Sequence, residues 1–516
     1  MAASAAETID CSERMVLPGF VNAHTHSVEH WARGLIRPLP LELWVQQLIR
    51  HEPRGCCGWF KEESWSATPA EAIGLSAMLC GVEALMSGCT VVLDHLLIRN
   101  LEDLEQAVQA YKALGIRAFI APMLGDDADM YSNYIPTVPD AAERNGKMRE
   151  DGSCCRGMRG DGSFRTERGQ RDVKKTEEVI RLWEDAATRF HAPDEGIEIV
   201  IGPVTVYNAS SELLAAATEI RKKYNLRGHI HLLETRAQAM MARQWFPSGS
   251  AVKHLRDLGF LQLPGTSCAH GIWLDDEEAS IMAECGASIV HNPLSNLRLG
   301  SGIMPLQKYE HAGVNITLGC DGSCSSDGQD MLEVLKLATI LQTVSSPEYR
   351  DWPLPSKTAL QLASANGYAA VGMKGKAGEI AEGMEADLTL WDLTSLALLP
   401  RTDPLSLLVL GSRSQAPGSG STLSDAWVRG RRVMRDGQPA GVSLQKLRSF
   451  LLAAQPHYRH PNVTEPSTSD MTAACEEEYR AALMLSPPVA AWPPSMTEYP
   501  QDRVIYDSCM TTPGTS

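Results

Sequence analysis

Short apolar runs alternate with longer amphipathic segments along most of this chain. Eight of the runs are rich in β-branched and other apolar residues, which predicts buried β-strands. These strands are predicted at residues 16–21, 90–93, 117–122, 197–201, 227–231, 266–270, 288–291 and 315–319. Helical periodicity predicts helices at residues 41–49, 69–87, 101–114, 173–190, 211–224, 237–258, 275–285, 305–312, 331–344 and 357–371.

Helices separate most of these strands, and this alternation determines the predicted fold. Parallel neighbours need long crossover connections, which are usually helices, so the repeated strand–helix order indicates a parallel sheet. Eight strands of this kind predict a (β/α)8 barrel, the TIM-barrel architecture of the α/β class. A doubly wound open sheet is the alternative fold, but no GxGxxG turn follows the first predicted strand.

Residues 15–372 form the predicted barrel domain, and the composition changes on both sides of it. Residues 1–14 are small and polar and are interpreted as the remnant of a small β domain. Short strand-and-turn pieces in residues 373–440 predict the main part of that domain. Residues 441–516 are rich in Pro, Ser and Thr and are interpreted as a loosely ordered tail, with one helix near residues 470–485.

Residues 125–173 interrupt the barrel pattern. This segment is rich in Gly, Arg, Asp and Ser and contains few apolar residues. Such a composition cannot bury enough apolar surface to offset its ordering entropy, so we expect a disordered insertion. A lid over a functional site is the alternative interpretation of the same segment.

The overall composition excludes several partners. The formal net charge of −16 argues against the phosphate backbone of a nucleic acid. The 13 cysteines are scattered and odd in number, which favours a reducing compartment over a disulfide framework. The N-terminus lacks a secretory signal pattern, and no run reaches about 18 apolar residues, the length of a membrane span. We therefore expect a soluble cytoplasmic protein without membrane partners; the oligomeric state stays open, a homo-oligomer included.

Several predicted strands end in a residue that can bind a metal ion or move a proton. The C-terminal ends of barrel strands form the active-site face, so these side chains are expected to converge. Two histidines separated by one residue are as consistent with surface histidines after a strand as with half of a metal site. Five strands that end this way favour the metal site. The residues are His24, His26, His231, His270, His291 and Asp321.

Four of these side chains form a candidate metal site. His24 and His26 project from the same face of the first strand. His231 ends the fifth strand, and Asp321 follows the eighth. Three imidazoles and one carboxylate suit Zn²⁺ or Fe²⁺ in a hydrolytic site and leave a position for water. Glu234 follows His231 by three residues and is placed either to carry protons or to stabilise the start of the next helix.

With these strand-end residues and the sequence around them, the chain resembles the amidohydrolase superfamily, in its metal-dependent deaminase and chlorohydrolase (ATZ/TRZ-like) branch. The resemblance covers most of residues 15–440. It rests on LPGFVNAHTH (17–26), SGCTVVLDH (87–95), HIHLLET (229–235), AHGIWLDDEE (269–278), VHNPLSNLRLGSGIMPL (290–306), LGCDGS (318–323) and AGEIAEGMEADLTLWD (377–392).

The resemblance implies a role for each residue. Glu234 and His270 correspond to residues that act on water and substrate. His229 is expected on the same strand as His231 but deeper, satisfied in the core. His291 is interpreted either as a substrate-side group or as a satisfied histidine at a strand end. The implied ligands of the metal ion are His24, His26, His231 and Asp321.

Three further comparisons with the family pattern set expectations. Relatives with two metal ions bridge them with a carboxylated lysine at the end of the fourth strand, where this chain reads EIVIGPVTVYN (198–208), so one ion is expected. Adenosine-type deaminases carry a histidine after a Gly-Pro pair at this point, where this chain has Val204, so the substrate stays open. Family members begin with strands that complete a small β-sandwich domain, which we expect to be incomplete or truncated here.

The resemblance implies hydrolysis of a carbon–nitrogen bond other than a peptide bond. The expected reaction is deamination of a nucleobase-like or triazine-like heterocycle, with water activated by the metal. Asp321 and Glu234 are expected to move protons, and His270 to polarise the tetrahedral oxygen or orient the water. The alternatives are hydrolysis of a cyclic amide or a chloro-heterocycle, and a catalytically silent barrel scaffold.

Overall fold

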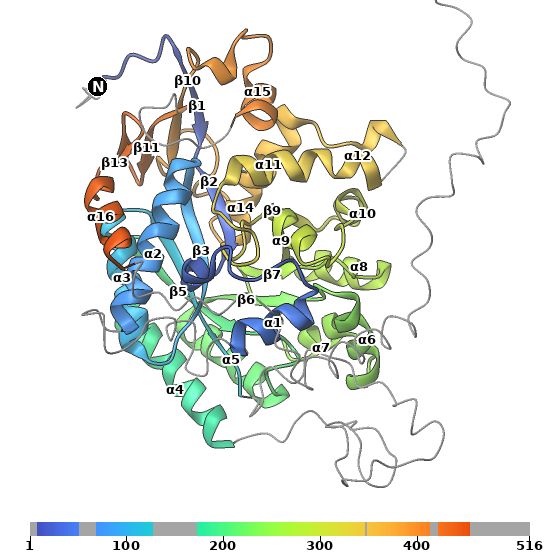
Figure 1. Cartoon of the computed structure of the whole chain (residues 1–516). Helices are drawn as coiled ribbons and strands as arrows, with labels where there is room; N and C mark the ends of the chain where they lie inside the picture. The colour runs from blue at the N-terminus through green and yellow to red at the C-terminus, as the bar shows by residue number, and fades with distance from the viewer. Residues whose placement is uncertain (1–7, 51–68, 127–172, 346–347, 413–421, 455–516) are drawn as a thin grey trace, which may run out of the picture.

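A computed structural model describes residues 8–50, 69–126, 173–345, 348–412 and 422–454 (Figure 1). Most of the insertion predicted at residues 125–173 and of the tail predicted at residues 441–516 therefore lies outside the described residues. The described chain forms an eight-stranded sheet and a five-stranded sheet. Its seven cysteines are all free thiols. None of its helices is long and apolar enough to cross a membrane.

The larger sheet is the predicted (β/α)8 barrel. Its strands follow one another in chain order and pair in parallel. The backbone N–H of Asp321 donates to the His24 carbonyl oxygen at 2.9 Å, which brings the two end strands together. The predicted fold class is thus confirmed. The strands are β2 (Phe20–Thr25), β3 (Cys89–Leu97), β4 (Arg117–Leu124), β5 (Ile197–Pro203), β6 (Arg227–Leu232), β7 (Thr266–His270), β8 (Ser288–His291) and β9 (Asn315–Leu318).

The helices around the barrel begin and end where local sequence signals place them. For example, α3 (Leu101–Leu114) begins after Asn100, whose side chain accepts a hydrogen bond from the Asp103 N–H, and ends at Gly115 in the left-handed conformation. The other helices of the barrel are α2 (Pro69–Met86), α4 (Val173–Phe190), α5 (Ser211–Tyr224), α6 (Arg236–Trp245), α7 (Ala251–Asp257), α8 (Asp276–Cys285), α9 (Pro293–Arg298), α10 (Leu306–His311), α11 (Met331–Ile340), α12 (Gln342–Ser345), α13 (Leu360–Ala363) and α14 (Ala365–Ala370).

The single helix predicted at residues 237–258 is two helices. A turn containing Pro247 and Gly249 separates α6 from α7. Proline cannot donate the backbone hydrogen bond that a helix interior needs, and Gly249 has a φ of 67°. The predicted helical region is therefore present, but it is divided at these two residues.

The strand predicted at residues 16–21 is also divided. β1 (Arg14–Pro18) lies in the small sheet, and β2 starts at Phe20 in the barrel. Gly19 joins them, and a Cβ atom at this position would lie 2.0 Å from the Thr90 hydroxyl oxygen. Only glycine lets the chain pass so close to β3. The prediction of one strand is wrong because consecutive apolar residues serve two different sheets.

The small sheet is antiparallel, in the order β1-β10-β11-β12-β13. β1 shows that the N-terminal contribution to this sheet extends past residue 14, the predicted boundary, to Pro18. The division into domains stays a prediction. The remaining elements of this part are β10 (Leu388–Asp392), α15 (Pro404–Gly411), β11 (Leu423–Val428), β12 (Arg431–Arg435) and β13 (Gln438–Pro439).

The described start of the predicted tail is packed against the barrel. α16 (Leu444–Ala454) buries Leu447 in the main hydrophobic core. Just before it, Gly441 passes so close to α3 that a Cβ atom would lie 2.1 Å from the Ala113 carbonyl oxygen. Residues 441–454 thus contact the barrel, and the helix predicted near residues 470–485 lies outside the described ranges.

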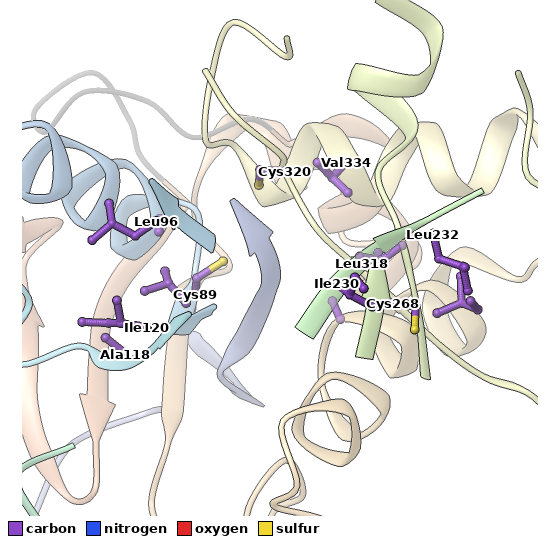
Figure 2. Close-up of a cluster of buried hydrophobic side chains, with 14 of the residues drawn as sticks. Cys89, Leu96, Ala118, Ile120, Ile230, Leu232, Cys268, Leu318, Cys320 and Val334 are labelled. Atoms are coloured by element: carbon purple, nitrogen blue, oxygen red, sulfur yellow. The ribbon is translucent and has the colours of Figure 1, made fainter. Parts of the chain in front are cut away.

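A large hydrophobic cluster fills the space between the barrel strands and the surrounding helices. Residues at alternate strand positions belong to this outer cluster, and their neighbours belong to a second cluster inside the barrel. Val92 of β3, for instance, is in the outer cluster, whereas Val91 and Leu93 are in the inner one. Figure 2 shows part of the outer cluster, with labels on Cys89, Leu96, Ala118, Ile120, Ile230, Leu232, Cys268, Leu318, Cys320 and Val334.

The described part of the connection between β2 and α2 lies against loops at the C-terminal end of the barrel. It contains the short helix η1 (Ser27–Ala32) and α1 (Leu41–Arg50). Trp44 of α1 packs in a third cluster with Leu299 and Cys324, which follow β8 and β9. The predicted helix α1 therefore lies against the loops that follow β8 and β9; Figure 1 shows its place in the fold.

Hydrogen bonds to one buried carboxylate hold the two described ends of the predicted insertion close together. The buried Asp126 carboxylate accepts hydrogen bonds from the Thr176 hydroxyl and the Ser210 N–H, both at 2.8 Å. Loop-closure entropy depends only weakly on loop length. We therefore expect a chain in which a short Gly-Ser linker replaces residues 127–172 to unfold cooperatively near the wild-type midpoint temperature. Insoluble protein would contradict this, and folded but inactive protein would support the lid interpretation.

Candidate active site

The predicted metal ligands converge at the C-terminal ends of the barrel strands. His24 and His26 come from the end of β2, His231 from β6 and Asp321 from the turn after β9. The Nε2 atoms of His26 and His231 are 3.1 Å apart. Asp321 Oδ1 lies 3.4 Å from His24 Nε2 and 3.5 Å from His26 Nε2. The four side chains therefore surround one small volume.

Hydrogen bonds on the far side of two imidazole rings fix how they face this volume. His26 Nδ1 donates to the His95 carbonyl oxygen and His231 Nδ1 to the Val204 carbonyl oxygen, each at 2.7 Å. A carbonyl oxygen can only accept, so Nδ1 carries the proton in both rings. The Nε2 lone pairs then point into the shared volume, the arrangement that metal-binding histidines adopt.

These atoms fit a cation. Two Nε2 lone pairs 3.1 Å apart repel each other unless a positive charge lies between them. His24 Nε2 is buried and has no hydrogen-bond partner among the described residues. The Asp321 carboxylate supplies negative charge beside it. Imidazole nitrogens and a carboxylate oxygen form a donor set suited to Zn²⁺ or Fe²⁺.

The electrostatic surroundings of the cluster favour positive charge within it. Burial lowers the pKa of His24 to about 4 and holds the pKa of His231 well below its usual range, so both are neutral near pH 7. Burial alone would lower the pKa of His26 too, but the carboxylates of Glu29 and Asp321 outweigh it and raise that pKa. Burial opposes ionisation of Asp321, yet the neighbouring His24 holds the pKa of this carboxyl well below its usual range.

Glu234 lies beside the predicted ligands and does not cap a helix. The N-cap of α6 is Thr235, whose side chain accepts from the Gln238 N–H. The Glu234 carboxylate instead lies 3.6 Å from His270 Nε2 and accepts a hydrogen bond from the Ser301 hydroxyl at 3.2 Å. Burial raises the pKa of Glu234, which suits a group that exchanges protons near neutral pH.

His270 is directed toward the same volume by an unusual backbone conformation. Alternation along β7 would place it on the side of Cys268, which packs in the outer cluster. Its φ of 73° ends the alternation, and Nε2 lies 3.8 Å from Asp321 Oδ2. On the other side of the ring, Nδ1 donates to the Asn296 side-chain oxygen at 2.9 Å. Left-handed non-glycine residues cluster at functional sites, and Asp321, with a φ of 62°, is a second example here.

The two other predicted histidines have different surroundings. His229 Nε2 is 2.8 Å from His24 Nδ1, and His229 Nδ1 is 2.7 Å from the Ser267 hydroxyl, so His229 is satisfied in the core as predicted. His291 is fully buried, which lowers its pKa to about 3. Neither of its ring nitrogens has a hydrogen-bond partner in the described part of the chain. His291 is therefore not a satisfied histidine, and the substrate-side interpretation is the one that remains.

The structure adds two groups that sequence reasoning missed. The His95 ring lies near the ligands, with its centroid 4.8 Å from that of His231, and the polar Asp94-His95 pair at the end of β3 was its signal. Glu42 of α1 accepts a hydrogen bond from the Thr235 hydroxyl, and its second oxygen, Oε2, has no partner among the described residues. Burial raises the pKa of Glu42 to about 7. No local pattern marks Glu42, because it lies on an ordinary amphipathic helix.

Comparisons with known proteins agree with this geometry. A model of the amidohydrolase family matches residues 15–427. Over 408 residues the chain is 32% identical to a 5-methylthioadenosine/S-adenosylhomocysteine deaminase of Thermococcus kodakarensis, covering 78% of this chain and 80% of that one. An adenosine deaminase structure from Xanthomonas campestris with bound zinc has a TM-score of 0.67 at 22% identity, covering 87% of each chain. An atrazine chlorohydrolase of Arthrobacter aurescens TC1 complexed with zinc has a TM-score of 0.69 at 21% identity, covering 86% of this chain and 88% of that one.

Proposed function

This chain belongs to the amidohydrolase family, and from that premise we propose that it is a metal-dependent aminohydrolase that removes an amino group from a small nitrogen heterocycle. One observation carries the proposal. Four side chains suited to a divalent ion converge beside a pair suited to proton transfer, Glu234 and His270, which lie 3.6 Å apart. The deaminase names of the similar proteins support the same reaction class.

The proposed cofactor is one zinc or iron(II) ion. A bound ion would lower the pKa of water toward neutrality and polarise the substrate. The proposed ligands are His24, His26, His231 and Asp321. Zinc is the first choice because similar structures contain it.

We expect purified protein to contain one zinc or iron ion per chain. The reason is that the candidate ligand groups all share His24 and so overlap at one place, and that β5 has no lysine that could bridge a second ion. Elemental analysis after dialysis against metal-free buffer measures this number. A reproducible two ions per chain, or active protein without metal, would contradict it.

In the proposed reaction, water adds to an electron-poor ring carbon and ammonia leaves. Asp321 accepts a proton from the attacking water as the carbon–oxygen bond forms. Glu234, whose pKa burial raises, carries protons to the ring nitrogen and the leaving amino group. His270, held at Nδ1 by Asn296, is placed to orient the water or polarise the tetrahedral oxygen. The carbon–nitrogen bond then breaks and a carbonyl group remains on the ring.

A substrate panel tests the proposal. Adenosine derivatives and aminotriazines are the proposed classes, and aminopyrimidines complete the panel. Ammonia release far above the background of metal-depleted protein would support deamination. Chloride release or ring opening without ammonia would change the bond that is cleaved. A metal-loaded protein that turns over none of these compounds would favour the silent scaffold.

A further inference from the structure

The two end strands of the barrel sheet, β2 and β9, are joined largely by side chains. Within the described ranges they share no ladder of backbone hydrogen bonds, although the Asp321 N–H reaches the His24 carbonyl oxygen. Side chains of buried residues add further connections, including one from the Thr25 hydroxyl to the Asp321 carbonyl oxygen at 3.1 Å, and we refer to this junction as the seam. The seam consists of Asn22, Thr25, Asp321 and Gln329.

The hydrogen bonds of the seam have one consistent direction. The Cys320 N–H donates to Asn22 Oδ1 at 2.9 Å, so the Asn22 amide nitrogen is left to donate to Gln329 Oε1, also at 2.9 Å. The Thr25 hydroxyl lies 2.9 Å from the same Gln329 oxygen. Gln329 Nε2 therefore faces the Asp321 carbonyl oxygen, an acceptor 2.6 Å away. The two ends of one amide group thus bind opposite sides of the seam.

The seam also divides the proposed metal site. His24 lies between Asn22 and Thr25 on β2, whereas Asp321 lies on the other side. The φ of 62° at Asp321 is a left-handed conformation that strains the backbone of a non-glycine residue. The hydrogen bond from Gln329 holds this backbone at its carbonyl group, and with it the direction of the Asp321 carboxylate relative to His24.

The backbone of Gln329 is itself held in place by hydrogen bonds. The residue is 1% exposed. Its carbonyl oxygen accepts from the Ser87 hydroxyl at 3.2 Å, and its N–H donates to the Glu83 carboxylate at 3.3 Å. Both partners belong to α2 or the turn that follows it, and α11 begins two residues after Gln329. A side chain anchored in this way can hold the two sides of the seam at a defined separation.

We propose that Gln329 is a positioning residue for the metal site. Its amide group sets the separation between the strand that carries His24 and His26 and the turn that carries Asp321, and through that separation the affinity for the ion. This inference rests on the proposed function, because it assumes that these side chains bind metal. Groups that orient metal ligands without touching the ion typically change affinity by about 10–100-fold when they are removed.

Gln329→Met tests the proposal, because methionine keeps the length of the side chain but lacks the amide group and its hydrogen bonds. We expect its zinc dissociation constant, measured on apoprotein by competition with a chelator, to rise about 10–100-fold. Gln342→Met is the matched control. Gln342 is equally buried, and its amide donates to the Met304 carbonyl oxygen at 3.2 Å, outside the seam. The control should lose some thermal stability but keep the wild-type zinc affinity.

Thr25→Val provides a milder variant, in case Gln329→Met does not fold. It removes one hydroxyl group from the seam while it keeps the side-chain shape, so the zinc dissociation constant should rise by a smaller factor. Wild-type affinity in whichever of these two variants folds, or an equal loss in Gln342→Met, would overturn the inference and leave Gln329 a structural residue. A wild-type protein that binds no zinc would instead overturn the proposed function, and this inference with it.

Discussion

Replacement of His231 by alanine is expected to remove the metal ion and the turnover together. His231 is one of the four proposed ligands, and its ring is already fixed in a metal-binding orientation by the Val204 carbonyl oxygen at 2.7 Å. The variant keeps three ligands and a polar space that water can enter. Because activation of the attacking water depends on the ion, turnover should fall to the level of metal-free protein.

Metal content and turnover must be measured on the same preparation of His231→Ala. His311→Ala is the control, because His311 is an exposed histidine at the end of α10, and it should change neither quantity. Removal of metal from the wild-type protein with a chelator should reproduce the loss, and added zinc should reverse it. A His231→Ala protein with full metal content would show that the proposed ligand set is wrong.

The predicted ligands could be located from the sequence because parallel strands end at one face of a barrel. Each of these residues ends a predicted strand or follows one within five residues, so strand prediction places them near one face, and the family resemblance assigned them as ligands. Alternation also predicts the two faces of β6, although the choice of His231 over His229 as ligand came from the family motif. His229 and His231 point inward, whereas Ile230 between them packs in the outer cluster.

Features that depend on contacts between distant segments could not be predicted in this way. The chain changes sheets at Gly19, where Thr90 lies too close for any Cβ atom, and the apolar pattern of residues 16–21 is the same with or without that contact. His270 reaches the site through a φ of 73°, which no property of the histidine signals. Strand periodicity therefore predicts which residues gather, but not how each is turned.

Residues that act through other residues are still harder to find. Glu42 meets Thr235, and Gln329 meets Asn22, across large separations in the chain. Neither residue lies in a strand-end motif, and both are polar residues whose burial follows from tertiary packing alone. Local sequence patterns place Glu42 on the surface of a helix and Gln329 in a loop.

Glu234→Gln is expected to keep the metal and to lower turnover by about 10²–10⁴-fold, the usual contribution of a positioned acid–base group. Glutamine has the shape of glutamate and can still accept the hydrogen bond from the Ser301 hydroxyl. It cannot take up and release a proton. The fold should not change, because the N-cap of α6 is Thr235 and not Glu234.

Glu278→Gln is the matched control for this prediction. Glu278 is also a buried carboxyl with a raised pKa, but its partners are Ser250 and the Asp275 N–H in the capping box of α8. Neutralising it should lower stability and leave kcat at its wild-type value.

The kcat at saturating substrate and the metal content per chain are measured for both variants. Near-normal kcat in Glu234→Gln would mean that the carboxylate only packs against His270 and Ser301, and loss of metal would mean that it is a ligand. Retained metal with a large loss of kcat assigns proton transfer to Glu234, because glutamine preserves its contacts and removes only its acidity.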